Sequence, residues 1–174
     1  MNNLDQAKEL CTRLLLIPFE GYAKKLPNGD CKAYPDPATG GFPWTIGYGS
    51  TYHADGTSVQ PNEVWTKEYS IRTKQTVLDK FLVGLLKLSP SLINESPNRI
   101  AAVLSLVYNI GLGNYKISNL RRKINNKDYE DLEREFLKWN TARVNGVRQV
   151  MKGLTRRRQA EYDLFAKGIP LGRL

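Results

Sequence analysis

The sequence has few residues of the kinds that bind metals or form disulfides. Its 174 residues include one histidine, His53, and two cysteines, Cys11 and Cys31. Neither cysteine belongs to a CxxC pair, so the sequence does not predict a zinc site. Cys11 falls on the apolar face of a predicted helix and is expected to pack there as a small hydrophobic residue. A Cys11–Cys31 disulfide stays open as an alternative, although the chain is unlike a disulfide-stapled secreted fold.

Long apolar runs are also absent. The N-terminus has no basic region, and the apolar run at residues 14–17 is much shorter than an export-signal core. No stretch approaches the length of a membrane span. We therefore expect the protein to be made and folded in the cytoplasm without a signal peptide.

Acidic residues are scarce relative to basic ones in the second two-thirds of the chain. Residues 1–60 carry five Lys/Arg and six Asp/Glu, residues 61–174 carry twenty-one and eleven, and the net charge is +9. This excess predicts a polyanionic partner: nucleic acid, an anionic membrane or a polymer of the bacterial envelope. No nucleic-acid-binding motif accompanies the charge, so nucleic acid is the least supported of the three.

Composition and pattern predict one domain, residues 1–174, with an N-terminal helix. Hydrophobic residues make up 41% of the chain, enough for a core. Apolar residues recur at helical spacing over residues 3–17, with Asn3 as the predicted N-cap and Gln6 completing a capping box. Pro18 is expected to end this helix near Ile17. Glu20 would then lie just past the helix end, beside the apolar surface that the helix buries.

The next segment predicts a small β lobe over about residues 19–60. Half of the fourteen glycines lie between residues 21 and 60. Short aromatic runs at 31–34 and 44–48 fit strands, and Asn28-Gly29 and Gly40-Gly41 fit turns. We expect a loop-rich sheet of two or three strands that is open to solvent.

From Pro61 onward the pattern predicts helices to the end of the chain. Residues 62–88 carry a clean apolar stripe and should link the sheet to the rest. Residues 97–110 are apolar nearly all round, with Ser96 as N-cap and Gly111 as stop, and should form the buried central helix. Shorter helices are expected around 117–125, 128–139 and 154–167, the last ending at Gly168. The fold class is therefore α+β, with a helical lobe of about 61–174 plus the helix 3–17.

Two carboxylates and a hydroxyl stand out in the stretch 19–49. Glu20 follows apolar residues that would disfavour its charged form, as a general acid for glycosidic cleavage requires. Asp36, between two prolines in a turn region, suits a carboxylate that stays ionised. Thr45, in a short aromatic run, could hold a water molecule through its hydroxyl.

The chain resembles the phage-type lysozymes, the endolysin family of glycoside hydrolases, in four short motifs that occur in the family's order. These are Glu20-Gly21, Tyr34-Pro35-Asp36 with Thr45-Ile46-Gly47-Tyr48-Gly49, Val107-Tyr108-Asn109-Ile110-Gly111, and Gly153-Leu154 with Arg157-Arg158, Glu161 and Leu164-Phe165. The resemblance implies a small β lobe and a helical lobe flanking a cleft. It also implies a muramidase that cleaves the β-1,4 bond between N-acetylmuramic acid and N-acetylglucosamine in peptidoglycan, with a Glu20–Asp36–Thr45 catalytic triad.

The resemblance further implies bacterial lysis without metal or cofactor, by a monomer that acts on the cell wall after release across the inner membrane. Tyr48, Gly49, Tyr108 and Asn109 are the substrate-binding candidates. Tyr108 and Asn109 fit equally well as a core aromatic and a helix-end polar residue. Loops at 24–29 and 37–43 are longer than in compact members of the family. The catalytic roles hold if both insertions stay in loops, and Asp36 depends on this most.

Other residues and rival functions have plainer interpretations. Arg157 and Arg158 are expected to pair with helix carboxylates such as Glu161, and His53 to lie in a surface loop. We expect Trp65, Tyr69 and Trp139 to pack rather than to bind sugar.

The rival enzyme is a lytic transglycosylase, which typically uses a single Glu. The rival of a different class is a cationic, membrane-active antibacterial protein, and anionic envelope polymers are a further possible partner.

Overall fold

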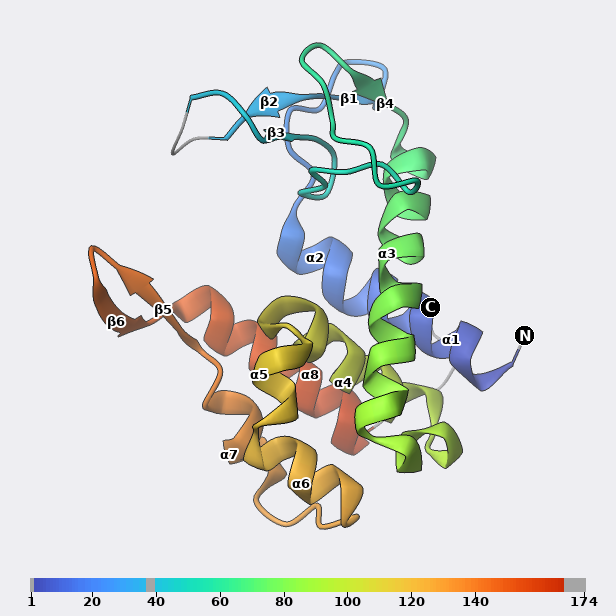
Figure 1. Ribbon diagram of the computed structural model, residues 1–174, viewed down its shortest axis with the longest axis vertical. Coiled ribbons are helices and arrows are strands. Elements are labelled where there is room, and N and C mark those ends of the chain that lie inside the picture. The colour runs from blue at the N-terminus through green and yellow to red at the C-terminus, as the bar shows by residue number, and fades with distance from the viewer. Residues whose placement is uncertain (1, 37–39, 168–174) are drawn as a thin grey trace.

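The structure is a computed structural model, which describes residues 2–36 and 40–167 in two lobes (Figure 1). A small lobe of short strands and loops lies at the top of the view, and a larger helical lobe lies below it. The helical elements are α1 (Asn3–Leu10), a π-helical segment (Cys11–Leu16), α2 (Ile17–Glu20), α3 (Lys67–Leu88), a 3₁₀ turn (Pro90–Asn94), α4 (Pro97–Ile110), α5 (Leu112–Lys116), α6 (Asn119–Asn125), α7 (Leu132–Leu137) and α8 (Lys152–Lys167). The strands are β1 (Cys31–Lys32), β2 (Tyr34–Pro35), β3 (Trp44–Thr45), β4 (Val64–Trp65), β5 (Thr141–Val144) and β6 (Val147–Val150).

The N-terminal helix begins as predicted but has a different cap. Its first helical residue is Asn3, and the N-cap is Asn2, whose side-chain oxygen accepts a hydrogen bond from the Asp5 backbone N–H at 2.9 Å. Asn3 therefore occupies the first helical position, and the predicted capping box, which placed the cap at Asn3, is wrong by one residue. An asparagine in either position gives a similar start signal, because the side chain needs only to reach an N–H in the first turn.

The same helical segment continues past Pro18, which the sequence pattern did not predict. In the π-helical segment the hydrogen bonds reach one residue further, and the Ile17 N–H donates to the Thr12 carbonyl. Pro18 then falls in the first turn of α2, where a missing N–H costs little. Gly21, with φ of 71°, ends the helix. Glu20 is therefore the last helical residue and not the first loop residue.

The β lobe holds two separate two-stranded ladders instead of one sheet. β1 pairs with β4, with Cys31 opposite Trp65, and β2 pairs with β3, with Tyr34 opposite Thr45. Because β4 follows Pro61, this lobe extends beyond the predicted limit at residue 60, and α3 begins at Lys67. A small core of five residues supports the lobe: Cys31, Ala33, Ile46, Val59 and Trp65.

The helical lobe is built around α4, as predicted. Residues 100–107 of this helix are all buried, and α1, α3 and α8 pack against it. Ser96 is the N-cap, and Gly111 ends the helix with φ of 85°. Cys11 lies in this core with no exposed surface, and both cysteines are free, so the alternative disulfide does not form. The long helix α3 runs from the β lobe into the helical lobe, which confirms its predicted linking role (Figure 1).

A β-hairpin interrupts the helices of the second half, where the prediction of helices to the end of the chain is wrong. β5 and β6 pair antiparallel around Asn145 and Gly146, which have φ of 49° and 80°. Asn-Gly is the preferred sequence for a two-residue hairpin turn, so the signal was present in the chain. Helix α8 follows at Lys152, and the predicted stop at Gly168 lies outside the described residues.

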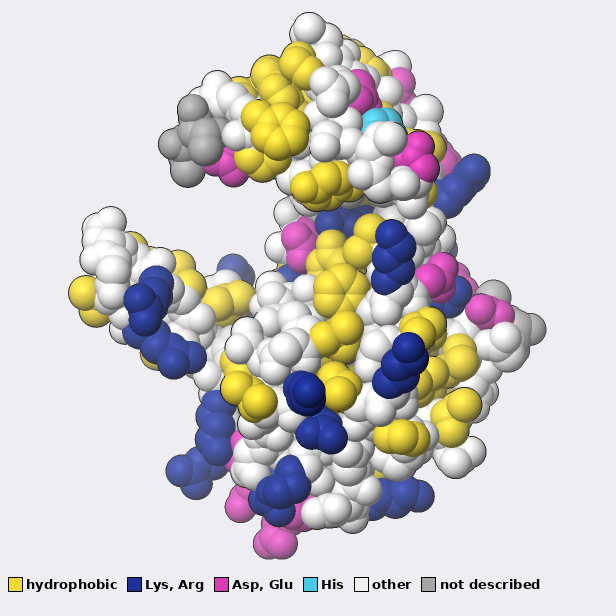
Figure 2. Space-filling view, viewed as in Figure 1, with side chains coloured by type: hydrophobic (Ala, Val, Ile, Leu, Met, Phe, Trp, Pro, Cys, Tyr) yellow, Lys and Arg dark blue, Asp and Glu magenta, His cyan; other side chains and the backbone are white. Residues whose placement is uncertain are grey.

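The two lobes leave a hollow between them. Figure 2 shows it as a deep indentation that opens on the left of the view, with the β lobe above and the helical lobe and its hairpin below. The hollow is the main feature of this face in which a ligand could be held.

None of the described helices is both long enough and apolar enough to cross a membrane.

Candidate active site

Glu20 lies where the two lobes meet. It is the last residue of α2, and its side chain is 23% exposed. The Arg157 Nη1 donates to Glu20 Oε1 at 2.9 Å from the N-terminal part of α8. On the side of the β lobe, a Cβ added at Gly49 would lie 3.6 Å from Glu20 Oε2. The carboxylate is thus close to backbone from one lobe and paired with a guanidinium from the other.

Arg157 is held in place by a buried network within the helical lobe. Its Nε donates to Glu161 Oε1 at 3.3 Å, and Ser105 Oγ donates to the same oxygen at 2.7 Å. Arg158 Nη2 donates to Glu161 Oε1 at 3.0 Å, and its Nε lies 2.8 Å from Oε2. Burial raises the pKa of Glu161, while Arg158, Ser105 and Arg157 oppose that rise. Three donors on one fully buried carboxylate favour its ionised form.

The predicted pairing of Arg157 and Arg158 with Glu161 is therefore confirmed. The contact between Arg157 and Glu20 was not predicted, because these residues are 137 positions apart in sequence. Arg157 thus connects the buried network to the surface of the hollow. Its guanidinium fixes the position of the Glu20 carboxylate through a charge-assisted hydrogen bond.

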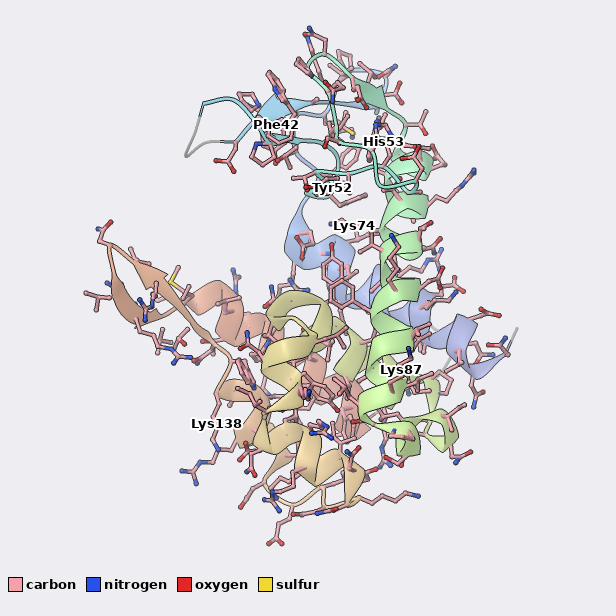
Figure 3. All side chains as sticks on the ribbon, viewed as in Figure 1. Phe42, Tyr52, His53, Lys74, Lys87 and Lys138 are labelled. Carbon is pink, nitrogen blue, oxygen red and sulfur yellow. The ribbon has the colours of Figure 1, made fainter. Side chains whose placement is uncertain are left out.

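A buried lysine lies beside Glu20. Lys74 of α3 is only 4% exposed and donates a hydrogen bond to the Tyr108 hydroxyl of α4. Figure 3 shows its side chain pointing from α3 toward α2, below the β lobe. Burial lowers the pKa of Lys74, and the charge of Glu20 opposes this. Burial also raises the pKa of Tyr108, as does Glu20. Sequence reasoning missed Lys74, although it precedes Leu78 by one turn in the apolar stripe of α3.

Asp36 and Thr45 belong to a second group, on the β2–β3 hairpin. Thr45 is opposite Tyr34 in the ladder, so these two side chains share one face, and Asp36 directly follows the last residue of β2. The charge of Asp36 contributes, after burial, to raising the pKa of Tyr34. Backbone hydrogen bonds between Asp36 and residues 40 and 41 close the hairpin end.

The described parts of both long loops lie outside the named strands. The segment 24–29 closes through a hydrogen bond from Gly29 N–H to the Leu26 carbonyl at 2.9 Å, just before β1. In the second loop, residues 40–43 lie between β2 and β3, and residues 37–39 lie outside the described residues. The two residues of β2 pair with the two residues of β3 beside this insertion. The role of Asp36 stays a prediction.

The substrate-binding candidates differ in exposure. Asn109 is exposed near the end of α4, and Gly49 is exposed beside Glu20. Tyr108 is half-buried beneath Lys74. Tyr48 is only 3% exposed and packs on Tyr22, with ring centroids 4.8 Å apart, so its ring faces the interior of the β lobe.

His53 lies in a loop, as predicted, but is half-buried and has hydrogen-bond partners. Its Nε2 lies 3.0 Å from Glu63 Oε2 and its Nδ1 lies 3.1 Å from the Tyr69 hydroxyl. The ring also packs on Trp65, which is buried in the core of the β lobe as predicted. Through these contacts, His53 ties the loop 51–58 to the start of α3.

In the described part of the chain, no group of three or more His, Cys, Asp or Glu side chains could hold a metal ion.

A small β lobe and a helical lobe that meet at a carboxylate define the lysozyme-like class of fold. The model of the phage lysozyme family matches residues 24–161, a range that begins four residues after Glu20. An endolysin of Acyrthosiphon pisum secondary endosymbiont phage 1 is 34% identical over 70% of this chain and 79% of its own length. An endolysin of Bacillus phage B103 is 33% identical over 72% of this chain, which spans only 44% of that protein.

Solved structures show the same fold. The endolysin from Escherichia coli O157:H7 phage FAHEc1 has a TM-score of 0.77 at 24% identity, over 97% of this chain and 96% of that one. This chain belongs to the phage lysozyme family. It is a peptidoglycan-degrading glycoside hydrolase of the lysozyme type, and its partner is the bacterial cell wall.

Proposed function

We propose that this enzyme hydrolyses the β-1,4 bond between N-acetylmuramic acid and N-acetylglucosamine, with Glu20 as general acid. Asp36 would stay ionised and, with the Thr45 hydroxyl, hold the attacking water or stabilise the positive charge that develops on the sugar. The observation that carries the proposal is the position of Glu20. Its carboxylate lies at the junction of the lobes, with Arg157 at 2.9 Å and the Gly49 backbone close by.

The ion pair with Arg157 positions Glu20 but also favours its charged form, whereas a general acid must carry a proton. Two features reduce this conflict. Arg157 also donates to Glu161 at 3.3 Å, so its charge is shared between two carboxylates. A bound glycan would displace water from around Glu20, which disfavours an ionised carboxylate. Proton transfer from Glu20 to the leaving oxygen would then restore the full ion pair with Arg157.

The β2–β3 hairpin supports the water-holding role. Asp36 directly follows β2 and Thr45 is the last residue of β3, in the lobe opposite Arg157. A carboxylate and a hydroxyl can accept from and donate to one water molecule. The pairing of β2 with β3 fixes the backbone that carries Thr45 and leads into Asp36.

Substitution of Glu20 by Gln tests the role of the acid. We expect turnover of purified cell walls to fall by about 10²–10⁴-fold, because the amide cannot donate the proton. The matched control is Glu9→Gln, which makes the same change at an exposed site with a loose 3.6 Å pair to Arg13. Thermal unfolding confirms that both variants are folded. Full turnover by Glu20→Gln would contradict the proposal, and killing without cell-wall cleavage would favour the membrane-active alternative.

Product mass tests the hydrolytic step. Hydrolysis adds one water to each cleaved bond, and the new muramic acid end is reducing. A lytic transglycosylase would instead leave anhydro ends with no gain of water. Anhydro products from the wild-type enzyme would overturn the roles proposed for Asp36 and Thr45.

A further inference from the structure

The β5–β6 hairpin separates two different hollows. Its register places Ala142 opposite Gln149 and Val144 opposite Val147 on one face. The Ala142 side borders a hollow of about 450 Å³ that also contacts α2 and Arg157, next to the active site. The other face borders a hollow of about 360 Å³ against α6 and α7. This second hollow is therefore on the side of the hairpin that faces away from the cleft.

The second face carries two arginines directly opposite each other. Arg143 pairs in register with Arg148, and both side chains are exposed (the dark blue side chains on the hairpin in Figure 2). Like charges at directly opposed positions destabilise a hairpin. Within the part of the chain that the structure describes, no ion pair involves either arginine. A local feature that costs stability without internal compensation is typical of a binding site.

The carboxylate near these arginines is already neutralised. Glu135 lines the hollow but is only 6% exposed, and it accepts a hydrogen bond from Lys138 at 2.6 Å. Residues 136–152 contain no Asp or Glu at all. Arg148 Nε donates to the Thr141 hydroxyl at 2.7 Å, which orients its guanidinium along the hollow. Arg148, which lines the hollow, is thus positioned to receive an anionic ligand, and Arg143 lies opposite it in the ladder.

The rest of the lining suits a sugar. Trp139 packs against the helical core on one side and borders the hollow on the other, together with Asn119 and Thr141. An indole face with a few amide and hydroxyl groups is typical of a concave site for a polar, partly apolar ring. Guanidinium groups bind carboxylates in a planar, two-point geometry. The combined chemistry is that of a glycan that carries carboxylates.

A lipid surface fits this face less well. A segment that lies on a membrane needs its apolar residues on one side. Val147 and Val150 are 61% and 66% exposed, but the register puts them on opposite faces of the hairpin. The arginine face is also hollow, whereas a bilayer needs a flat or convex contact. Charge and shape therefore favour a polymer strand over a membrane.

We propose that the hollow bounded by Trp139, Thr141 and Arg148, with Arg143 at its edge, is a second binding site for a carboxylate-bearing peptidoglycan strand. The strand bound there would hold the enzyme on the polymer and raise the local concentration of bonds at the cleft. The proposal depends on the family's substrate but not on the roles of Glu20, Asp36 or Thr45.

The test is the double variant Arg143→Gln/Arg148→Gln, with Lys80→Gln/Lys87→Gln on α3 as a control that removes the same charge. We expect affinity for purified insoluble peptidoglycan at low salt to fall about 2- to 30-fold in the hairpin variant, the range for two exposed ion pairs. The control should change less. Turnover of a short soluble oligosaccharide should be unchanged, and thermal stability should be equal or higher because the repulsion is gone.

Two outcomes would overturn the proposal. One is equal loss of affinity in both variants, which would mean that only overall charge matters. A second is unchanged affinity for peptidoglycan with weaker binding to vesicles of anionic phospholipid, which would assign the face to a membrane. Failure of the catalytic roles is distinguishable, because Glu20→Gln loses turnover but keeps its affinity for peptidoglycan.

Discussion

The buried carboxylate of Glu161 should be the costliest single charge to remove from this protein. It has no exposed surface, and it is contacted by Ser105, Arg157 and Arg158. Glu161→Gln keeps the size of the side chain but leaves Arg158 in the interior without its anion, and Arg157 with Glu20 as its remaining carboxylate partner. Breaking a buried ion pair by removing one partner costs about 3–5 kcal/mol. For a chain of this length, that is a fall in melting temperature of about 6–20 °C.

Urea and thermal unfolding measure this loss, and Glu9→Gln is again the control. The Glu9–Arg13 pair is a 3.6 Å contact between side chains that are 38% and 56% exposed. Removing such a pair costs about 0–1 kcal/mol. The reasoning would be refuted if Glu161→Gln also lost less than about 1 kcal/mol, the range of an exposed pair.

A double variant tests whether the loss of stability comes from leaving Arg158 without its anion. In Glu161→Leu/Arg158→Leu, one guanidinium is removed together with the carboxylate. Replacement of a whole buried pair by apolar residues is often neutral or stabilising. We therefore expect the double variant to be more stable than Glu161→Leu alone. At a temperature where Glu161→Gln is folded, its turnover should also fall, because Arg157 loses the contact that holds it against Glu20.

Two further tests concern Gly47 in the β lobe and Lys74 of α3. Gly47→Ala should lower the unfolding free energy by about 1–3 kcal/mol in urea titrations, because Gly47 has φ of 60° and a Cβ there would lie 2.6 Å from Ser70 Oγ. Gly113→Ala, which meets nothing within 4 Å, should not lower it. Burial lowers the pKa of Lys74 from 10.5, so the unfolded chain binds the Lys74 proton more tightly than the folded chain does. The contribution of Lys74 to the free energy of unfolding of the wild type therefore rises as the pH increases toward 10.5. The stability of Lys74→Met relative to wild type should therefore decrease between pH 7 and pH 10, and a constant difference would contradict the assignment.

The parts of the fold that local signals define were predictable. The central helix α4 has its cap, its stop and its apolar residues in one continuous stretch, and the structure matches it at both ends. The hairpin at residues 141–150 also left a local signal, since Asn145-Gly146 is the preferred sequence of a two-residue hairpin turn. It was missed because the surrounding segments are helical and the flanking strands do not alternate between apolar and polar residues, β6 being exposed along its whole length.

The features that could not be predicted depend on distant partners. Pro18 would end an ordinary helix, and only the shifted hydrogen bonds of the preceding π-helical segment make it compatible with α2. A lysine in an apolar stripe gives no sign of whether it reaches solvent, so the burial of Lys74 against Tyr108 required the packed structure. The contact between Arg157 and Glu20 likewise needs α2 and α8 to be in place.

The arrangement around Glu20 links the placement of this carboxylate to the stability of the helical lobe. On one side, Arg157 contacts it from a network whose members are almost fully buried. On the other side, the backbone at Gly49 of the β lobe lies close to it. Ser105 of α4 and Arg157, Arg158 and Glu161 of α8 form that network, so a substitution that disrupts it should lower both the stability of the helical lobe and the turnover that depends on Glu20.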